Sequence, residues 1–351
     1  MGIVFDRESP GGGVEAVCTL ENGKVFLEWH FCFRDSEKTE RKIRTPLEPD
    51  EDFTVEKGMS VRLLLMDAGK EVVLECEAPV CEEEPLRSVL LQPRLWNGLR
   101  DPYLYRVEVF LRDGRGRCLD RVSTLLPLRS LEAQKTGEKD AFLLNGTVVC
   151  PRMVRYRIPS AGTGANRQRM MLEDLRHLCE LGANCMVVER KEGPVRLFLQ
   201  LCDRMGILVF LKTEAGLLRI YGQERKWNLD WEGAPVLRGT DEGLLSPEYG
   251  LPTALFYQYR AKWGKAPFVR IIPESIHRLE SGNYEVLCYS NCSRVALYSD
   301  GSLFGFQSGE GTFRFREVPA RFPGIMLTAE GDGCSQSLSV QKSFLNSHAA
   351  S

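Results

Sequence analysis

Apolar and polar side chains alternate along the first part of the chain. Between residues 105 and 112, tyrosine, valine and leucine alternate with arginine and glutamate, with Phe110 as an exception, and Asp113-Gly114 then supplies a turn. The apolar segments 25–29 and 61–65 are short and are separated by polar turns. Several short strands at this spacing predict a β-sandwich over residues 1–131.

The period of the pattern changes near residue 140. On a helix, Met171, Leu175 and Leu178 fall on one face, and Gly182 suits the C-terminal cap. The predicted elements are a hairpin arm and first strand within 147–156, a helix between Asn166 and Gly182, a strand at 184–188, a helix starting near Pro194 and a strand at 206–211. This alternation predicts parallel strands joined by helical crossovers.

A parallel sheet of three or four strands has open edges that something must cover. Residues 213–250, which are rich in Gly and Pro, are the expected covering segment, unless a second copy or a partner chain covers the edge.

Alternation returns near the end of the chain. The segments 284–289 and 294–298 read as strands and are followed by an Asp300-Gly301 turn, which predicts a second small β-sandwich over residues 267–346. The stretch 132–140 is polar and charged, as is typical of a domain junction. The sequence therefore predicts a multi-domain α+β protein divided into residues 1–131, 132–266 and 267–351.

Composition narrows the classes of partner. Of the 351 residues, 43% are hydrophobic and 27% are charged, as in ordinary soluble proteins. The formal net charge of −2 gives no general attraction to nucleic acid or to anionic lipid. No apolar run approaches the roughly 20 residues of a membrane helix, and the first residues show no secretory signal. We therefore expect no nucleic-acid partner and no membrane association.

The chain contains 12 cysteines, but their spacing does not form a metal-binding pattern. Neither Cys76 with Cys81 nor Cys288 with Cys292 has a second Cys or His pair at zinc spacing. Most cysteines lie in apolar stretches, which favours buried reduced thiols and a cytoplasmic location. The Gly11-Gly12-Gly13 turn lacks the Lys-Ser/Thr ending of a phosphate loop. We therefore expect no metal and no cofactor.

Four motifs occur in an order that resembles a known enzyme family. They are Leu95-Trp96-Asn97-Gly98-Leu99-Arg100-Asp101-Pro102-Tyr103-Leu104-Tyr105, Phe142-Leu143-Leu144-Asn145-Gly146, Leu201-Cys202-Asp203-Arg204-Met205-Gly206-Ile207-Leu208-Val209, and the run from Gly250 to Trp263. This order resembles glycoside hydrolase family 2, the β-galactosidase and β-glucuronidase family. The resemblance implies an immunoglobulin-like sandwich before a β/α barrel and, at the tail, the immunoglobulin-like domain that follows the barrel in some bacterial β-galactosidases.

Compared with this family, the chain is expected to contain only an incomplete β/α (TIM-like) unit in place of the closed barrel. The segment from Ala141 to Trp263 is about half of the roughly 250 residues that a closed β/α barrel needs. The family's general acid follows strand four in an Asn-Glu pair, and its nucleophile glutamate ends strand seven. No Asn-Glu dipeptide occurs between Phe210 and Trp263, and no residues are available for strands four to seven.

On the strands that remain, three positions that the family uses in its active site also carry different residues. Val187 stands where the family has an arginine, Arg190 where it has a histidine, and Lys212 where it has an acidic residue. The sequence thus predicts that framework residues are retained while both catalytic glutamates are lost.

Three carboxylates are the candidate catalytic residues. Retaining glycoside hydrolysis needs two carboxyl groups about 5–5.5 Å apart. Glu248, in Ser246-Pro247-Glu248-Tyr249-Gly250, resembles the family's nucleophile context but precedes the last-helix motif, where the family has a turn. Asp230 and Glu232 form the other candidate pair and resemble remnants of the eighth strand. For all three, the alternative is an exposed carboxylate on a loop.

Two tryptophans near these carboxylates are candidate sugar-binding residues. Trp227 and Trp231 offer flat apolar rings on which the C–H groups of a pyranose can stack. Spaced four apart, they could equally bury one side of a short segment.

Two functional hypotheses follow. In the first, the chain is a degenerate β-galactosidase-like protein without glycosidase activity of its own, serving as a carbohydrate-associated binding or assembly module. In the second, it is an active β-glycosidase with a rebuilt or intersubunit active site. A convergent carboxylate pair would distinguish the two.

Overall fold

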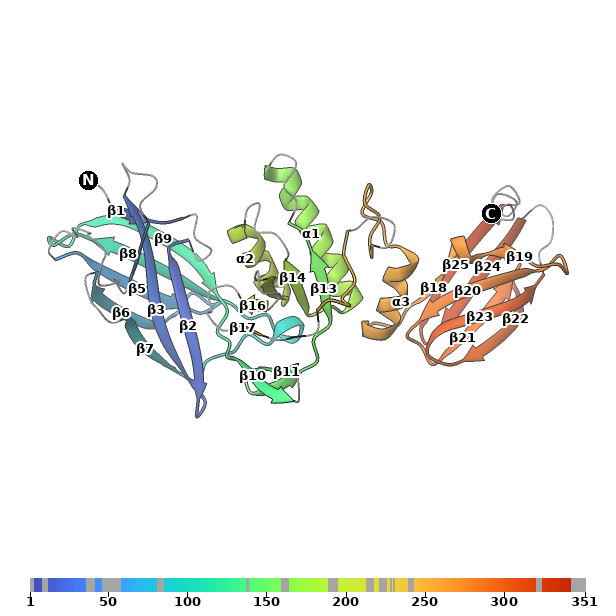
Figure 1. Cartoon of the computed structure of the whole chain (residues 1–351), viewed down its shortest axis with the longest axis horizontal. Helices are drawn as coiled ribbons and strands as arrows, with labels where there is room; N and C mark the ends of the chain where they lie inside the picture. Colours follow the sequence, from blue (N-terminus) through green and yellow to red (C-terminus); the bar gives the residue numbers. More distant parts are fainter. Residues whose placement is uncertain are drawn as a thin grey trace. The chain divides into compact units, whose positions relative to one another are not determined.

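In the computed structural model, the protein is a β-rich chain with few helices (Figure 1). The structure describes residues 3–7, 12–35, 42–45, 58–80, 85–136, 139–158, 164–188, 195–212, 218–220, 226–227, 229, 231–238, 243–319 and 324–341. The chain forms two compact units. The N-terminal unit comprises Met1–Leu175 and Asn184–Ala234, and the C-terminal unit comprises Arg176–Ala183 and Pro235–Ser351.

The N-terminal unit begins with two antiparallel sheets that share one core. The first sheet contains β1 (Ile3–Phe5), β2 (Val14–Glu21), β3 (Lys24–Asp35), β4 (Lys42–Thr45) and β7 (Leu86–Leu91). The second has the order β6 (Val72–Pro79), β5 (Ser60–Met66), β8 (Tyr105–Arg112) and β9 (Cys118–Leu126). Tyr105, Val107, Val109 and Leu111 of β8 are all buried, as their alternation predicts. They pack with Trp29 and other residues of the first sheet.

A short antiparallel sheet leads into the β/α part of this unit. It consists of β10 (Leu131–Thr136), β11 (Lys139–Leu144) and β12 (Thr147–Val149), after the 3-10 turn η1 (Gly98–Arg100). The β11–β12 hairpin turns at Asn145-Gly146, and both residues have positive φ angles, 52° and 73°. This is the backbone that an Asn-Gly hairpin turn favours.

The next sheet combines parallel and antiparallel strands. β13 (Met153–Tyr156), β14 (Cys185–Val188) and β15 (Leu208–Lys212) are parallel, and α1 (Gly164–Leu181) and α2 (Val195–Met205) are the crossovers. This part of the prediction is confirmed, although α1 begins two residues before Asn166. The described strands β16 (Leu218–Ile220) and β17 (Lys226–Trp227), however, are antiparallel to their neighbours. β16 therefore covers the outer edge of β15, within the segment 213–250 that was expected to cover it.

Both crossover helices end on a glycine in the left-handed conformation. Gly182 has φ of 85° and Gly206 has φ of 77°. After α2, the N–H of Ile207 donates to the Cys202 carbonyl and the N–H of Gly206 donates to the Asp203 carbonyl. This Schellman pattern satisfies carbonyl groups at the helix end, and α1 ends in the same way at Gly182.

The C-terminal unit contains a helix and two antiparallel four-stranded sheets. The helix α3 (Ala254–Trp263) begins at Thr253, whose side chain accepts from the Phe256 N–H. One sheet contains β18 (Val269–Ile271), β19 (His277–Arg278), β20 (Tyr284–Ser290) and β23 (Gly311–Val318), with the turn η2 (Pro273–Ser275). The other has the order β22 (Ser302–Ser308), β21 (Arg294–Ser299), β24 (Gly324–Gly331) and β25 (Cys334–Gln341). One core contains residues of both sheets, among them Phe313 and Leu327.

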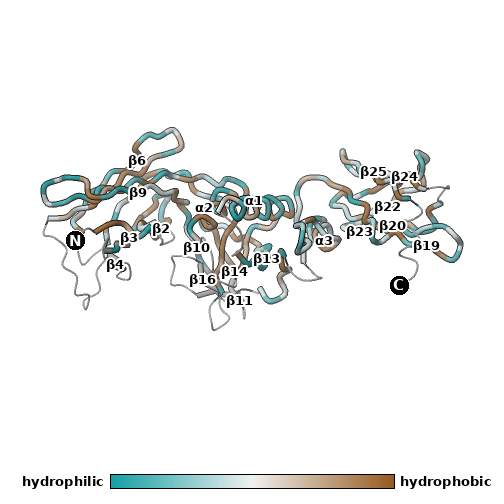
Figure 2. Tube along the Cα trace, turned by 90° about the horizontal axis from the view of Figure 1, so that it is seen from above, coloured by the Kyte–Doolittle hydropathy of each residue, from teal (hydrophilic) through white to brown (hydrophobic). Residues whose placement is uncertain are grey.

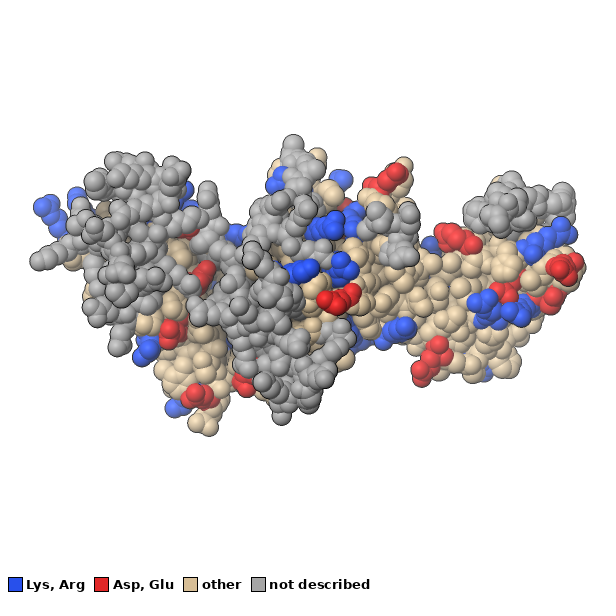
Figure 3. Space-filling view, in the orientation of Figure 1, with Lys and Arg blue, Asp and Glu red and all other residues tan. Residues whose placement is uncertain are grey.

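The hydropathy of the elements matches their burial, and charges of both signs lie on the surface. In Figure 2 the trace is brown through β14, whose four residues are all buried, and mixed along α1. On the face shown in Figure 3, Lys and Arg side chains lie between Asp and Glu side chains rather than forming one large field of a single sign over the described surface. Among the described helices, none is both long enough and apolar enough to span a bilayer.

Candidate functional site

The carboxyl ends of β13, β14 and β15 are where a parallel β/α unit would place a site. β13 ends at Tyr156, which is 2% exposed and turned toward the helices. Its hydroxyl donates to Asp174 of α1 at 3.0 Å, and its ring stacks on Phe198 of α2 with 5.2 Å between centroids. Val188 ends β14 and is also buried. These two strand ends therefore carry packing residues.

The third strand end is different, because Lys212 is exposed. Its ammonium nitrogen lies 4.7 Å from the centroid of the Trp231 ring. This is the geometry of a cation–π contact. The end of β15 therefore presents a cation at the position where the related family has an acidic residue.

Trp231 belongs to the core on the face of this sheet that points away from α1 and α2. It is 7% exposed and packs in a cluster with Trp96, Phe142, Phe210 and Leu229. Little of its ring is free for a sugar, so its position favours the packing alternative that the spacing left open. The alternation Trp227-Asn228-Leu229-Asp230-Trp231 in the sequence is the signal that predicts one buried face here.

The other candidates are distributed as follows. Glu232 is exposed in the N-terminal unit. Glu248 is exposed in the C-terminal unit, in a turn closed by the Gly250 N–H on the Ser246 carbonyl at 3.0 Å. Asp230 and Arg190 lie outside the described residues, as does the side chain of Trp227. Val187 is fully buried in the same core as Trp231.

Three buried or partly buried carboxylates in the described chain each have a hydroxyl or a cation among their partners. Asp174 accepts from the Tyr156 hydroxyl. Asp113 accepts from the Arg117 side chain at 2.7 Å. Asp203 is paired with Arg129 at 2.8 Å. No two of these described groups form the close acid and nucleophile pair of a retaining hydrolase.

The motif residues meet at a junction within the N-terminal unit. The indole N–H of Trp96 donates to the Asp203 carbonyl at 2.7 Å, and Asn145 donates to the Trp96 carbonyl at 3.0 Å. The same Asn145 accepts from the Ser130 N–H at 2.9 Å. Motifs that lie far apart in the sequence thus form one hydrogen-bonded junction between the sandwich and the β/α part. The role of these residues here is structural.

Asp203 is the ionisable centre of this junction. Arg129 pairs with its carboxylate and also lies over the Trp96 ring, 4.5 Å from the centroid. Burial raises the pKa of Asp203, and Arg129 only partly opposes this effect. Sequence reasoning identified the motif but missed the ion pair, because nothing local to Arg129 indicates a partner 74 residues away.

Two of the described cysteines, Cys179 and Cys288, do not have the character of nucleophiles. Burial raises the pKa of Cys179 to about 11 and that of Cys288 to about 12. Thiols of this kind carry little thiolate at neutral pH and are chemically inert. No group of three or more metal-ligating side chains occurs among the residues that the structure places.

One described hollow lies in the C-terminal unit, with a volume of about 170 Å³. Its lining includes Asp300, Phe304 and Pro319. Asp300 accepts from the Met326 N–H at 2.9 Å, so its carboxylate serves the adjoining turn. The hollow offers no second carboxylate among its lining residues.

Comparison with known proteins gives relatives of one kind, although no family model matches the chain. This chain is 28% identical over 143 residues to a β-glucuronidase of Bacteroides fragilis, and the match covers 40% of this chain and 20% of that protein. It is 26% identical over 181 residues to a β-galactosidase of Alteromonas mediterranea, covering 50% of this chain and 16% of that protein. The chain therefore matches about a fifth or less of the length of these two relatives.

Solved structures show the same likeness in the fold. An FMN-binding β-glucuronidase from Facaelibacterium prausnitzii L2-6 aligns with a TM-score of 0.70 at 14% identity, over 97% of this chain and 75% of that chain. A β-glucuronidase from Bacteroides uniformis aligns with a TM-score of 0.68 at 15% identity, over 97% of this chain and 62% of that chain. A putative β-galactosidase from Bacteroides fragilis aligns with a TM-score of 0.67 at 13% identity, over 97% of this chain and 74% of that chain. The chain is thus similar to β-glucuronidases and β-galactosidases of the glycoside hydrolase family 2 type, as its motifs predict, and it has their β-rich, multi-domain fold.

Proposed function

We propose that this chain is a degenerate relative of family 2 glycoside hydrolases that lacks glycosidase activity alone and serves as a carbohydrate-associated binding or assembly module. On this proposal, residues 1–131 and 267–351 are immunoglobulin-like sandwiches, and residues 132–266 are the remnant of a truncated β/α barrel. The proposal also includes a cytoplasmic location and association with a second copy or a partner chain.

The observation that carries the proposal is the pairing at the edge of β15. Lys212, at the end of this third parallel strand, pairs with Leu218 of the antiparallel β16. A barrel would add its fourth parallel strand at this edge. With β16 in that place, the part of the sheet that the structure describes has no fourth parallel strand beside β15. This supports the proposal that strands four to seven, on which the family carries both catalytic glutamates, are missing.

The surroundings of the strand end support the same conclusion. Lys212 and Trp231 contact each other where a hydrolase needs carboxylates. A cation near the reacting carbon would also disfavour the oxocarbenium-like transition state, although exposure to water weakens this repulsion. Sugar stacking on Trp227 remains part of the proposal, since stacking needs no acid pair.

The test is turnover of aryl β-galactoside and aryl β-glucuronide by the pure protein between pH 5 and 8, with a long incubation. We expect release of the aryl group to match that of a heat-denatured sample. The Glu248→Gln variant is assayed beside the parent. Turnover by the parent that disappears in the variant would identify Glu248 as a nucleophile, whereas turnover by both proteins would favour the rebuilt or intersubunit site.

A further inference from the structure

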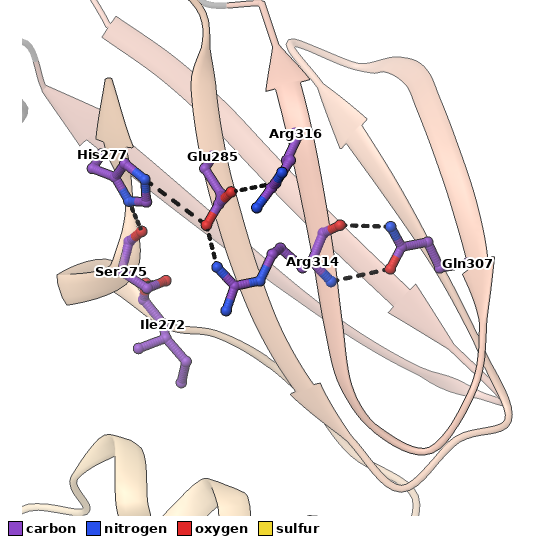
Figure 4. A network of polar contacts seen from close by, with 7 residues as sticks. All are labelled: Ile272, Ser275, His277, Glu285, Gln307, Arg314 and Arg316. Carbon is purple, nitrogen blue, oxygen red and sulfur yellow. Dashed lines mark hydrogen bonds and ion pairs between the residues drawn. The ribbon is translucent and has the colours of Figure 1, made fainter. Parts of the chain in front are cut away.

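A charged cluster lies on the outer face of the sheet that contains β20 and β23 in the C-terminal unit. It consists of Glu285 on β20, Arg314 and Arg316 on β23, and His277 on β19, and we call it the Glu285 cluster (Figure 4). Side chains on alternate positions of β20, such as Val286, point into the core, so Glu285 points outward. Its side chain is nevertheless only 6% exposed.

The two arginines are what cover this carboxylate. Arg314 donates from Nη1 to Oε1 of Glu285, and Arg316 donates from Nε to Oε2 at 2.8 Å. Burial would raise the pKa of Glu285, but the hydrogen bonds and positive charges of Arg314 and Arg316 hold it below its ordinary value. Glu285 is therefore ionised at neutral pH.

The cluster has more positive than negative charge. One carboxylate faces two guanidinium groups, which leaves an excess of one positive charge before His277 is considered. The side chains of Arg314 and Arg316 are 53% and 70% exposed. The imidazole Nε2 of His277 lies 3.8 Å from Glu285 Oε1, and its Nδ1 lies 3.0 Å from the Ser275 carbonyl. This part of the sheet therefore presents cations to solvent.

Most donors of the two arginines are not used within the described chain. A guanidinium has five N–H donors, and the contacts that the structure describes for these two side chains are those to Glu285. Forked, exposed N–H groups of this kind match the two oxygens of a ligand carboxylate.

The strand that carries the arginines is held in place at its edge. The Gln307 side chain of β22 accepts from the Arg314 N–H at 3.0 Å and donates to the Arg314 carbonyl at 2.6 Å. Both backbone groups at this position are therefore occupied, as Figure 4 shows. An added strand cannot pair with β23 here, so a ligand must approach the face of the sheet. Leu287, opposite Arg314 on β20, is half-buried on that face and adds apolar area.

We propose that the Glu285 cluster binds the carboxylate groups of an acidic saccharide, with Arg314 and Arg316 as the direct contacts and Glu285 as the group that positions them. The choice of a saccharide rests on the proposed function, while the choice of an anion rests on charge complementarity alone. The binding surface is distinct from the strand ends of the β/α part, and its assay does not depend on turnover.

The test is calorimetric titration of the full chain with a galacturonic acid hexamer, and with a neutral galactose hexamer for comparison. We expect binding of the acidic hexamer that weakens as salt is added, and no binding of the neutral one. Arg316→Gln and Arg314→Gln should each weaken binding about tenfold, since a charge-assisted hydrogen bond is lost. A variant that melts at the same temperature as the parent is correctly folded, so the binding measured for that variant tests the proposal.

The matched control is Arg87→Gln, because Arg87 is 66% exposed and pairs with Glu28 in the N-terminal unit. It makes the same change in net charge and should bind as the parent does. Equal loss in the control would overturn the site, as would unchanged binding in both cluster variants or no binding by the parent. Equal binding of a glutamate decapeptide would overturn the saccharide assignment. Equal binding of the neutral hexamer would overturn the charge argument but leave carbohydrate association standing.

Discussion

Replacing Gly206 by alanine tests whether the motif junction is packed as closely as the structure shows. Gly206 ends α2 with φ of 77°, and a Cβ at this position would lie 2.5 Å from the carbonyl carbon and oxygen of Gly98. Atoms of backbone cannot move aside as a flexible side chain can. The substitution therefore adds a steric conflict to the strain of a left-handed alanine.

Gly116 provides a matched control for the strain alone. Its φ is 78°, and a Cβ there would meet nothing within 4 Å. A left-handed L-residue costs about 1–2 kcal/mol at either position. Overpacking adds about 1–3 kcal/mol where no space exists. We therefore expect Gly206→Ala to lower the free energy of unfolding by about 1–3 kcal/mol more than Gly116→Ala.

The measurement is urea unfolding of the parent and the two variants, followed by circular dichroism and tryptophan fluorescence. Both substitutions lie in the N-terminal unit, so both should change the same transition. If the two variants unfold at the same urea concentration, then Gly206 and Gly98 are not in close contact, and the junction argued from Trp96 and Asp203 is wrong.

Three further outcomes are expected. Trp96→Phe should lower the free energy of unfolding by about 2–4 kcal/mol in urea, because it removes the shorter of the two hydrogen bonds to the Asp203 carbonyl and opens a cavity; an unchanged midpoint would contradict this. Because the pKa of Glu285 is lowered in the folded state, its stabilisation should be present above its ordinary value of 4.5 and disappear as pH falls. Thermal melts of Glu285→Gln should therefore show less acid destabilisation than the parent, and equal acid sensitivity would refute the linkage. Removing residues 214–239 should uncover the edge of β15 and cause association on size-exclusion chromatography, and a monomer with the parent melting temperature would count against it.

Local pattern was enough to predict several elements of this fold. The alternation in β8 predicted its buried face, and Gly182 marks the predicted end of the first crossover helix. Gly206, which the sequence placed at the start of a strand, instead ends the second crossover helix, and β15 begins at Leu208. Strand and helix alternation predicted that β13, β14 and β15 are parallel. These features depend on the backbone periods of 2 and 3.6 and on which residues tolerate positive φ, and both are properties of short segments.

The antiparallel strands β16 and β17 were not predicted, because they are short and pairing direction depends on which strand edge is free. From the sequence, Trp231 could stack on a sugar or bury one side of a short segment, and its neighbours in the folded chain, Lys212 among them, favour the second alternative.

The sequence by itself determined the order of the parallel strands and their crossover helices and the resemblance to a family, and it predicted the loss of that family's catalytic positions. The tertiary structure decided what the retained motifs do, because Trp96 and Asp203 are 107 residues apart and no local pattern connects them. It likewise decided that Glu285 lies beneath two arginines, since these residues come from separate strands that meet only when the sheet forms. Periodicity specifies which face of a segment is buried, whereas the partner on that face is specified only by long-range packing.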